Sequence, residues 1–309
     1  MTNLLIFLLT HNRPILAMQA IKSILAQTDR RFKLVVSDNS DTDELRPLIG
    51  DLKEITYIKR PLALSGIDHG NLVLNEIVAH DSSQYFSLFH DDDVMLSNYV
   101  SEFWKAQTLF PEAATFGANA IIERHGIGSG LSFKAARPYI GPISPNDLLR
   151  RYFSHHQLGI APFPSYIYKT SALNGMQFDI AGGKYSDVQW LSRWCIKGPM
   201  IWIAEPMMVY RFHERNDGNL ESRFDRLRFL TYLKSSRDLF SPEILSDYRN
   251  FLYKKFLPRL KDKGYEKSYR LLSQFITRHR FQRLFRLSFY NAFFNKVSIK
   301  LYLKFDKKV

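Results

Sequence analysis

The first ninety residues alternate short apolar segments with amphipathic ones. Four of these segments have the character of buried strands and three have the spacing of helices; in chain order they cover 4–9, 14–27, 33–37, 43–52, 56–59, 70–79 and 85–89. This alternation predicts a mostly parallel sheet with helices on both faces. Ligands of such sheets bind beyond the carboxyl ends of the strands. The residues that follow each strand are therefore the first candidates for function.

The strand-like run 85–89 ends in His90 and three consecutive carboxylates, Asp91, Asp92 and Asp93. Ionised carboxylates about 5 Å apart repel by roughly 3 kcal/mol at an effective dielectric constant of about 20, and a bound divalent cation reverses that sign. Alternation along an extended chain sends Asp91 and Asp93 to one side and Asp92 to the other. Two aligned carboxylates together with phosphate oxygens suit Mg²⁺ or Mn²⁺. A solvated acidic turn, or a run that caps the next helix, is the alternative.

Polar clusters also follow the first two strand-like runs, at residues 10–13 and 38–41. The sequence has no Gly-x-Gly-x-x-Gly after the first strand and no Gly-Lys-Ser/Thr phosphate loop, which weighs against the common dinucleotide and P-loop folds. Asp38 ends the second strand, where several doubly wound folds place a carboxylate that binds the nucleoside. The same residue type also forms turns and caps helices, so Asp38 alone does not decide between these roles.

Four segments, in this order and spacing, resemble family 2 glycosyltransferases with the GT-A fold: LTHNRP at 9–14, AIKSILAQT at 20–28, VVSDNS at 35–40 and HDDD at 90–93. The resemblance extends over most of the first 220 positions. It implies an α/β fold, a Rossmann-like mixed sheet flanked by helices. It also implies a catalytic domain over 1–220, with a nucleotide-binding half over 1–100 and an acceptor half over 101–220, followed by a basic helical region over 221–309.

For the donor, the resemblance implies that Thr10, Asn12 and Arg13 lie along the nucleotide and that Asp38 hydrogen-bonds the base. Capping of the helix that begins near Pro14 is the alternative role for Thr10 and Asn12.

The same resemblance makes Asp91 and Asp93 the DxD pair of these enzymes. Asp93 is then expected to bind the cation directly, with Asp91 nearer the ribose and the metal-bound water, and Asp92 is expected among the donor-binding residues. Residues 59–75 resemble the family's donor-binding stretch only loosely. Arg60 and Asn71 are the side chains in that stretch that would reach the nucleotide or its diphosphate.

In the acceptor half, Asp187 matches the family's general base, after a glycine-rich loop and at the start of a helix predicted over 188–195. Sugar transfer with inversion needs a carboxylate beside the acceptor hydroxyl, to take its proton as the new bond forms. Capping of that helix would look the same in the sequence, and Asp179 is the second candidate for the base. Residues 162–168 resemble the segment that lies near the acceptor, with a proline-kinked edge strand as the alternative.

Residues 210–216 resemble the Tyr-Arg-x-His-x-x-Asn ending that is common in bacterial members of the family. His213 is expected to complete the metal shell or to contact the diphosphate, because neutral imidazole binds divalent metals. Arg211 is expected to neutralise charge on the departing diphosphate. A structural histidine and a surface salt bridge are the alternatives.

Charge is distributed unevenly: residues 1–219 hold 21 Lys/Arg and 22 Asp/Glu, whereas residues 220–309 hold 22 Lys/Arg and 8 Asp/Glu. Over 280–305, cations flank aromatic and apolar residues that recur every four positions, which is an amphipathic basic stripe. Each such cation contributes about 1 kcal/mol at an anionic membrane surface, so this stripe is expected to bind the membrane. Packing of the same aromatics on the catalytic domain is the alternative.

The sequence has a single cysteine, Cys195, and its N-terminal apolar run is too short and lacks the basic flank of a signal peptide. The expected location is therefore the cytoplasm, with peripheral contact at the inner face of the cell membrane. No apolar run approaches the roughly 20 residues that span a bilayer.

Together these features predict an inverting, metal-dependent glycosyltransferase that uses Mn²⁺ or Mg²⁺ and a nucleoside-diphosphate sugar, UDP first. The expected acceptor is a glycan carried by a lipid, in bacterial surface polysaccharide biosynthesis. A nucleotidyltransferase of GT-A-like fold should show a glycine-rich N-terminal loop, which is absent. A nucleic-acid-binding protein acting through the basic tail would leave the motifs of the first 220 residues unexplained, so no nucleic-acid partner is expected. The sequence does not decide whether the chain forms a homodimer through its tail.

Overall fold

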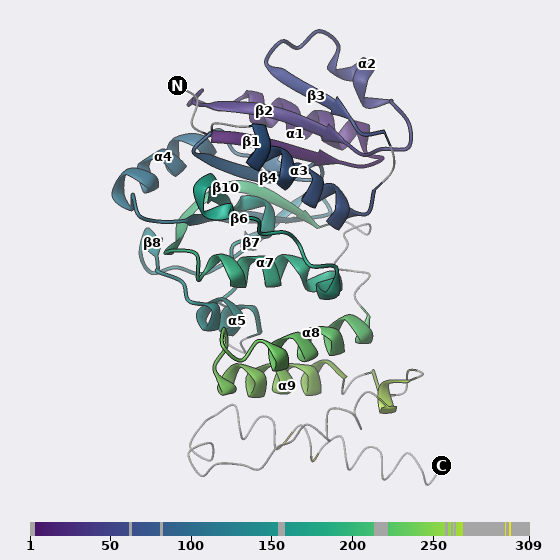
Figure 1. The fold of residues 1–309 in the computed structure, drawn as a ribbon, viewed down its shortest axis with the longest axis vertical. Coiled ribbons are helices and arrows are strands. Elements are labelled where there is room, and N and C mark those ends of the chain that lie inside the picture. The colour runs from purple at the N-terminus through teal and green to yellow at the C-terminus, as the bar shows by residue number, and fades with distance from the viewer. Residues whose placement is uncertain are drawn as a thin grey trace.

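The computed structural model describes residues 4–61, 64–80, 83–153, 158–212, 222–256, 259–260, 262, 264–267, 294 and 297. Strands from these residues form one mixed sheet in the order β3-β2-β1-β4-β9-β6-β10-β5, with β7 paired to β6 and β8 to β10. Figure 1 shows β1 to β4 at one end of the molecule and the helices α8 and α9 at the other.

The strands are β1 (Leu4–Thr10), β2 (Phe32–Asp38), β3 (Ile55–Lys59), β4 (Tyr85–His90), β5 (Val94–Met95), β6 (Thr115–Arg124), β7 (Ile127–Leu131), β8 (Tyr139–Ile140), β9 (Ile167–Lys169) and β10 (Met200–Phe212). The α-helices are α1 (Pro14–Leu25), α2 (Leu45–Ile49), α3 (Gly66–His80), α4 (Tyr99–Leu109), α5 (Pro145–Phe153), α6 (Thr170–Leu173), α7 (Ser186–Trp194), α8 (Arg223–Ser235) and α9 (Pro242–Phe256). Two 3-10 helices, η1 (Phe163–Ser165) and η2 (Ile180–Tyr185), precede β9 and α7.

The first four strands and their connecting helices follow the order that the sequence predicts. β1 pairs in parallel with β2 and with β4, and β2 pairs in parallel with β3. The register places Thr10 beside Asp38, Asp38 beside Lys59, and Leu9 beside His90. The carboxyl ends of these strands therefore lie at one edge of the sheet.

Both faces of the sheet are buried. Successive side chains of β1 point to opposite faces: Leu5 and Phe7 join one apolar cluster, and Ile6 and Leu8 join the other. This explains why β1 is a continuous apolar run in the sequence, since a strand covered on both faces has no polar side.

The acceptor half adds strands that are not all parallel. β9 lies between β4 and β6 and is antiparallel to both, so the edge-strand alternative for residues 162–168 is wrong. Pro162 and Pro164 precede β9, in and before η1, where no ladder hydrogen bond is lost.

A third apolar cluster joins the C-terminal helices to the acceptor half. It contains Phe153 of α5 and Tyr185 next to α7, together with Phe229 of α8 and Tyr248 of α9. The ring centroids of Tyr185 and Phe229 lie 4.7 Å apart in a stacked arrangement. The helix α8 is therefore packed on the segment that leads into α7, and α9 packs on α5 and α8.

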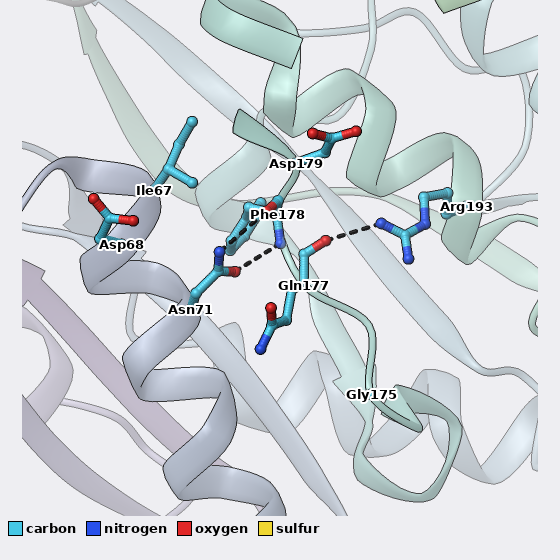
Figure 2. Close-up of a pocket in the computed structure, with 8 residues that line it drawn as sticks. All are labelled: Ile67, Asp68, Asn71, Gly175, Gln177, Phe178, Asp179 and Arg193. Carbon is cyan, nitrogen blue, oxygen red and sulfur yellow. Dashed lines mark hydrogen bonds between the residues drawn. The ribbon is translucent and has the colours of Figure 1, made fainter. Parts of the chain in front are cut away.

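The loop before α7 is also fixed to α3 in the first half of the chain (Figure 2). The Asn71 side-chain amide donates to the Phe178 carbonyl (3.0 Å), and the Phe178 N–H donates to Asn71 Oδ1 (2.7 Å). Gly70 lets the ring approach, because a Cβ there would lie 3.0 Å from Phe178. Among the residues that the structure describes, no helix combines the length and the apolar character required to cross a bilayer.

Candidate active site

The carboxylates after β4 are held by residues that follow β1. Asp91 Oδ2 accepts hydrogen bonds from the Thr10 hydroxyl (2.8 Å) and the His11 N–H (3.1 Å). The Arg13 guanidinium donates to Asp91 Oδ1 at 3.1 Å and to Asp92 Oδ2 at 2.7 Å. Burial, followed by the neighbouring Asp92, raises the pKa of Asp91 above its ordinary value, and Arg13 opposes this shift. Thr10 and Arg13, expected along the nucleotide, here contact the carboxylates.

Asp93 is nearly inaccessible to solvent, with 1% of its surface exposed, and only one of its two carboxylate oxygens has a hydrogen-bond partner. Its Oδ1 accepts a hydrogen bond from the Arg211 N–H at 3.0 Å, whereas its buried Oδ2 has no hydrogen-bond partner. Burial, followed by the charge of Asp92, raises the pKa of Asp93 well above its ordinary value. A buried carboxylate oxygen without a protein partner is costly unless something else binds it.

One group of side chains among the described residues has the spacing of a metal site. Ligand atoms of His90, Asp92 and Asp93 all lie within 4.8 Å of one another. This group differs from the expected one: Asp91 is not a member, and both of its oxygens are hydrogen-bonded to Thr10, His11 and Arg13. Residues 91–93 form a turn, so strand alternation does not apply to them.

His213, the other expected ligand, lies outside the described residues. His90 stands directly before the carboxylates in the sequence, and this adjacency was the available signal for its place in the group.

Arg211 lies beside the carboxylate turn but is directed differently from the expectation. Its Nε donates to the Asp92 carbonyl at 2.5 Å, and its Nη1 donates to Gln19 Oε1 at 2.6 Å. The guanidinium therefore ties β10 to the turn and to α1.

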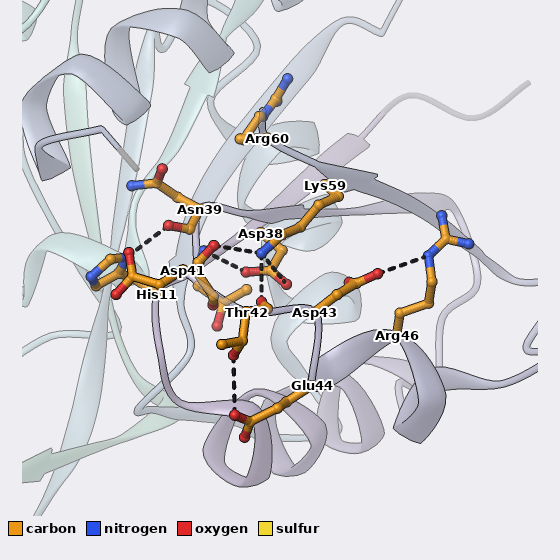
Figure 3. Close-up of polar contacts among 12 residues, drawn as sticks. His11, Asp38, Asn39, Asp41, Thr42, Asp43, Glu44, Arg46, Lys59 and Arg60 are labelled. Carbon is orange, nitrogen blue, oxygen red and sulfur yellow. Dashed lines mark hydrogen bonds and ion pairs between the residues drawn. The ribbon is translucent and has the colours of Figure 1, made fainter. Parts of the chain in front are cut away.

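The ends of β1, β2 and β3 carry a second polar cluster (Figure 3). Asp38 is fully buried, and it accepts hydrogen bonds from the Ser40 N–H (2.8 Å) and the Tyr57 hydroxyl (2.7 Å). Lys59 Nζ lies 3.6 Å from Asp38 Oδ2. Burial alone would raise the pKa of Asp38, but these hydrogen bonds and Lys59 outweigh it, so the pKa lies below its ordinary value. Tyr57 and Lys59 are partners that the sequence did not indicate.

Asn12 joins the loops that follow β1 and β2. Its φ of 54° is in the left-handed region, which asparagine tolerates better than most residues. Its N–H donates to Ser40 Oγ (2.8 Å), and its side chain exchanges hydrogen bonds with Asp41 at 2.7 and 2.9 Å. The alternative of capping α1 does not apply, because that helix has no side-chain cap and its N-cap residue is Arg13.

The Arg60 guanidinium is buried and paired with a carboxylate of α3. Arg60 is 6% exposed, and its guanidinium pairs with both oxygens of Glu76 (2.5 and 2.8 Å) and donates to Ser37 Oγ at 2.7 Å. Ser37 also contacts His69, and burial, followed by Arg60, lowers the pKa of that histidine to about 4. Arg60 is thus part of a buried network with Ser37 and Glu76, and its contact with the nucleotide stays a prediction.

Asp187 is the second residue of α7, and its Oδ1 accepts a hydrogen bond from the Val188 N–H at 2.7 Å. Burial raises the pKa of Asp187 to about 6, with the Val188 hydrogen bond acting in the opposite direction. A carboxylate with this pKa is ionised at neutral pH and is still basic enough to accept a proton.

A series of rings connects the candidate metal-binding group to α7. The centroids of His90 and Phe163 are 5.7 Å apart, those of Phe163 and Phe178 are 5.8 Å apart, and Phe178 stacks on Trp190 at 4.4 Å. Trp190 is three residues after Asp187 in α7. A continuous series of ring contacts thus runs from His90 to the helix that carries the candidate base. Asp179 is on the exposed loop beside Phe178.

Comparison with solved structures identifies the fold of the chain. The TarS fragment 1–349 of S. aureus, in complex with UDP-GlcNAc, has a TM-score of 0.64 at 15% identity, over 87% of this chain and 79% of that chain. The mannosyltransferase PcManGT of Pyrobaculum calidifontis, in complex with GDP-Man and Mn²⁺, has a TM-score of 0.51 at 14% identity, over 99% of this chain and 88% of that chain. The fold is therefore the GT-A fold of nucleotide-sugar transferases.

Sequence comparison adds a family match over the first part of the chain. Residues 5–129 match the model described as glycosyl transferase family 2. The GalNAc(5)-diNAcBac-PP-undecaprenol beta-1,3-glucosyltransferase of Campylobacter jejuni is 25% identical over 248 residues, which are 77% of this chain and 74% of that protein. Residues 5–129 thus match a glycosyl transferase family 2 domain, and the comparisons indicate a glycosyltransferase.

Proposed function

We propose that this protein is an inverting, metal-dependent glycosyltransferase that moves a sugar from a nucleoside-diphosphate sugar to a hydroxyl of a lipid-linked glycan. The observation that carries the proposal is the group of His90, Asp92 and Asp93, in which Asp93 Oδ2 is buried without a hydrogen-bond partner. Buried polar atoms rarely stay unpaired in folded proteins.

The residues in this group fit Mn²⁺ or Mg²⁺. Carboxylate oxygens and water are the ligands that suit both Mg²⁺ and Mn²⁺. When bound, such a cation supplies a positive charge that stabilises the diphosphate leaving group. Asp92 and Asp93 would hold it, with His90 beside them, while Asp91 keeps Thr10 and Arg13 in place. Arg211 acts as a support of the carboxylate turn, since its guanidinium is directed at Asp92 and Gln19.

We place the donor nucleotide at the carboxyl ends of β1 to β4. Asn12 and Asp38 are the proposed contacts there, and UDP is the proposed nucleotide. Support comes from the structural neighbours, whose complexes contain UDP-GlcNAc in one case and GDP-Man with Mn²⁺ in the other.

Asp187 is the proposed general base. A single displacement with inversion needs one carboxylate on the acceptor side and no covalent intermediate. Asp187 takes the proton of the acceptor hydroxyl as that oxygen bonds to the sugar carbon and the bond to the diphosphate breaks. Its pKa of about 6 supports this role.

The acceptor is proposed to be a glycan on a lipid diphosphate, in a bacterial surface polysaccharide pathway. This proposal is supported by the relative from Campylobacter jejuni, whose name describes an acceptor of this kind, GalNAc(5)-diNAcBac-PP-undecaprenol. The excess of cations over residues 220–309 supports contact with an anionic membrane surface. The stripe over 280–305 lies, except for residues 294 and 297, outside the described residues, so this contact rests on sequence.

The test is thermal stability of the purified chain with UDP, GDP, dTDP and CMP, each with and without Mn²⁺. A ligand at 100 times its dissociation constant stabilises the folded state by about 2.7 kcal/mol. We expect a Mn²⁺-dependent shift with one diphosphate, lost in Asp93→Asn and kept in Asp51→Asn, which changes an exposed carboxylate. Absence of any nucleotide-dependent shift in the folded wild-type protein would sink the proposal.

A further inference from the structure

A depression of about 460 Å³ lies between the first turns of α3 and the loop before α7 (Figure 2). Its lining is Ile67, Asp68, Asn71, Gly175, Gln177, Phe178, Asp179 and Arg193. The strand-end residues that we assign to the donor and the cation are not part of this lining. The depression therefore shares no residue with the proposed donor and cation sites.

The charge of the depression disfavours an anion. Asp68 and Asp179 bring two carboxylates, and Arg193 brings one guanidinium, which leaves a net negative charge at neutral pH. A nucleotide or a diphosphate would be repelled, because like charges that are brought together without compensation raise the free energy of binding. Carboxylate acceptors and guanidinium donors on one rim suit the hydroxyl groups of a neutral ligand, which both donate and accept.

The wall of the depression is aromatic. Phe178 is half-exposed and rigidly held, because its ring stacks on Trp190 at 4.4 Å and its backbone is hydrogen-bonded on both sides by Asn71. Ile67 adds a second apolar surface. A pyranose ring has C–H groups on its faces and hydroxyls around its rim, so it matches an apolar wall with a polar border.

The position of the depression is on the acceptor side. Phe178 is in the loop that leads into η2 and Asp187, and Arg193 is six residues after Asp187, roughly 9 Å further along α7. Arg193 is also fixed to this loop, since its Nη1 donates to the Gln177 carbonyl at 2.9 Å. A ligand in the depression would therefore contact both the loop that leads to the candidate base and the helix that carries it.

We propose that this depression binds a pyranose ring of the acceptor glycan, at a distance from the hydroxyl that receives the new sugar. The inference rests on the proposed function and extends it to acceptor recognition. Phe178 and Ile67 contact the apolar face of the ring, and Asp68, Asp179 and Arg193 bind its hydroxyls. An acceptor that extends into the depression then binds more tightly than a single sugar.

The experiment is saturation-transfer NMR on the full chain with UDP and Mn²⁺ present. The probes are the methyl glycosides of glucose and galactose and of their 2-acetamido counterparts. We expect binding of at least one glycoside, with affinity at least tenfold weaker in Asp68→Asn/Asp179→Asn and no signal in Gln177→Trp, whose indole fills the depression. Asp51→Asn, an exposed carboxylate elsewhere, is the matched control and should bind as the wild type does.

Failure of this inference differs from failure of the proposed function. Two results would overturn the acceptor subsite while the thermal shift with UDP and Mn²⁺ persists. One is the absence of a saturation-transfer NMR signal for all four glycosides, and the other is a signal that survives in folded Gln177→Trp. Displacement of the bound glycoside by the intact UDP-sugar, but not by UDP, would assign the depression to the donor sugar and also overturn it. Loss of the nucleotide shift in the wild type would instead sink the transferase assignment.

Discussion

The donor side and the acceptor side of the candidate site are held in place by different means. On the donor side, the register of parallel strands brings Thr10, Asp38 and His90 to one edge of the sheet. On the acceptor side, Asp187 follows residues 174–185, which contain no strand and only the short η2. Its position therefore depends on contacts from elements far away in the chain.

Two such contacts hold the acceptor loop from opposite directions. Asn71 of α3 holds the backbone of Phe178, and Asp225 of α8 accepts a hydrogen bond from the Lys184 N–H. Asp225 is itself fixed in a capping box with Ser222. The difference between the two sides suggests that donor binding is robust to changes in this loop, whereas the position of the base is not.

The largest effect is expected from Asp187→Asn. Loss of the general base should lower kcat by about 10²- to 10⁴-fold, while the donor side, held by strand register, should bind UDP and Mn²⁺ as before. Steady-state kinetics and thermal shifts measure the two quantities. Asp179→Asn, at the second candidate for the base, is the comparison, and a kcat that falls less in Asp187→Asn than in Asp179→Asn would move the base to Asp179.

Gly183→Ala should break the contact between α8 and the base loop. Gly183 has φ of 56°, and an added Cβ would lie 2.8 Å from Arg228 Nη1 and 3.0 Å from Asp225 Oδ1. We expect a loss of about 1–3 kcal/mol in the free energy of unfolding, together with a lower kcat. Denaturant unfolding gives the first quantity and steady-state kinetics the second.

Gly126→Ala is its control, because Gly126 also has a positive φ, of 78°, but no atom within 4 Å of the added Cβ. Equal kcat values in the two variants would show that α8 does not position the base.

The same contrast explains what could be predicted from the sequence. The parallel strands β1 to β4 and their helices have strong periodic patterns, so their order follows from the sequence, and the residues at their carboxyl ends follow with them. The antiparallel insertion of β9 has no such signal, because a three-residue strand is defined only by its partners β4 and β6.

Side-chain partners were harder to predict than elements. Arg60 follows β3, where a phosphate contact was plausible, but Glu76 lies 16 positions later and neutralises it in the fold. The candidate metal-binding group of His90, Asp92 and Asp93 differs from the pair Asp91 and Asp93 that strand alternation predicts, because the carboxylates form a turn. Such pairings depend on tertiary distances that no local pattern encodes.

The activity should depend on pH through the acceptor side. Asp187, with a pKa of about 6, accepts a proton only when it is ionised, so kcat should fall about tenfold from its plateau by pH 5. Because its pKa is raised on folding, its protonated form favours the folded state, and this contribution is lost as the pH rises through about 6. Asp187→Asn should remove that part of the pH dependence of unfolding. A kcat that stays constant from pH 5 to 8 would contradict the assignment.

Asn71→Ala tests the second contact with the acceptor loop and should have the smallest effect. It removes both hydrogen bonds to the Phe178 backbone, which are worth about 1 kcal/mol each when lost from partly buried groups. We expect a several-fold increase in the KM for the acceptor and an unchanged dissociation constant for UDP with Mn²⁺. Asn75→Ala, one turn later in α3, removes only the exposed contact with Gln177 and should change neither quantity. A weaker affinity for UDP in Asn71→Ala would place this asparagine on the donor side, as the sequence first suggested, and would remove the separation between the two sides of the site.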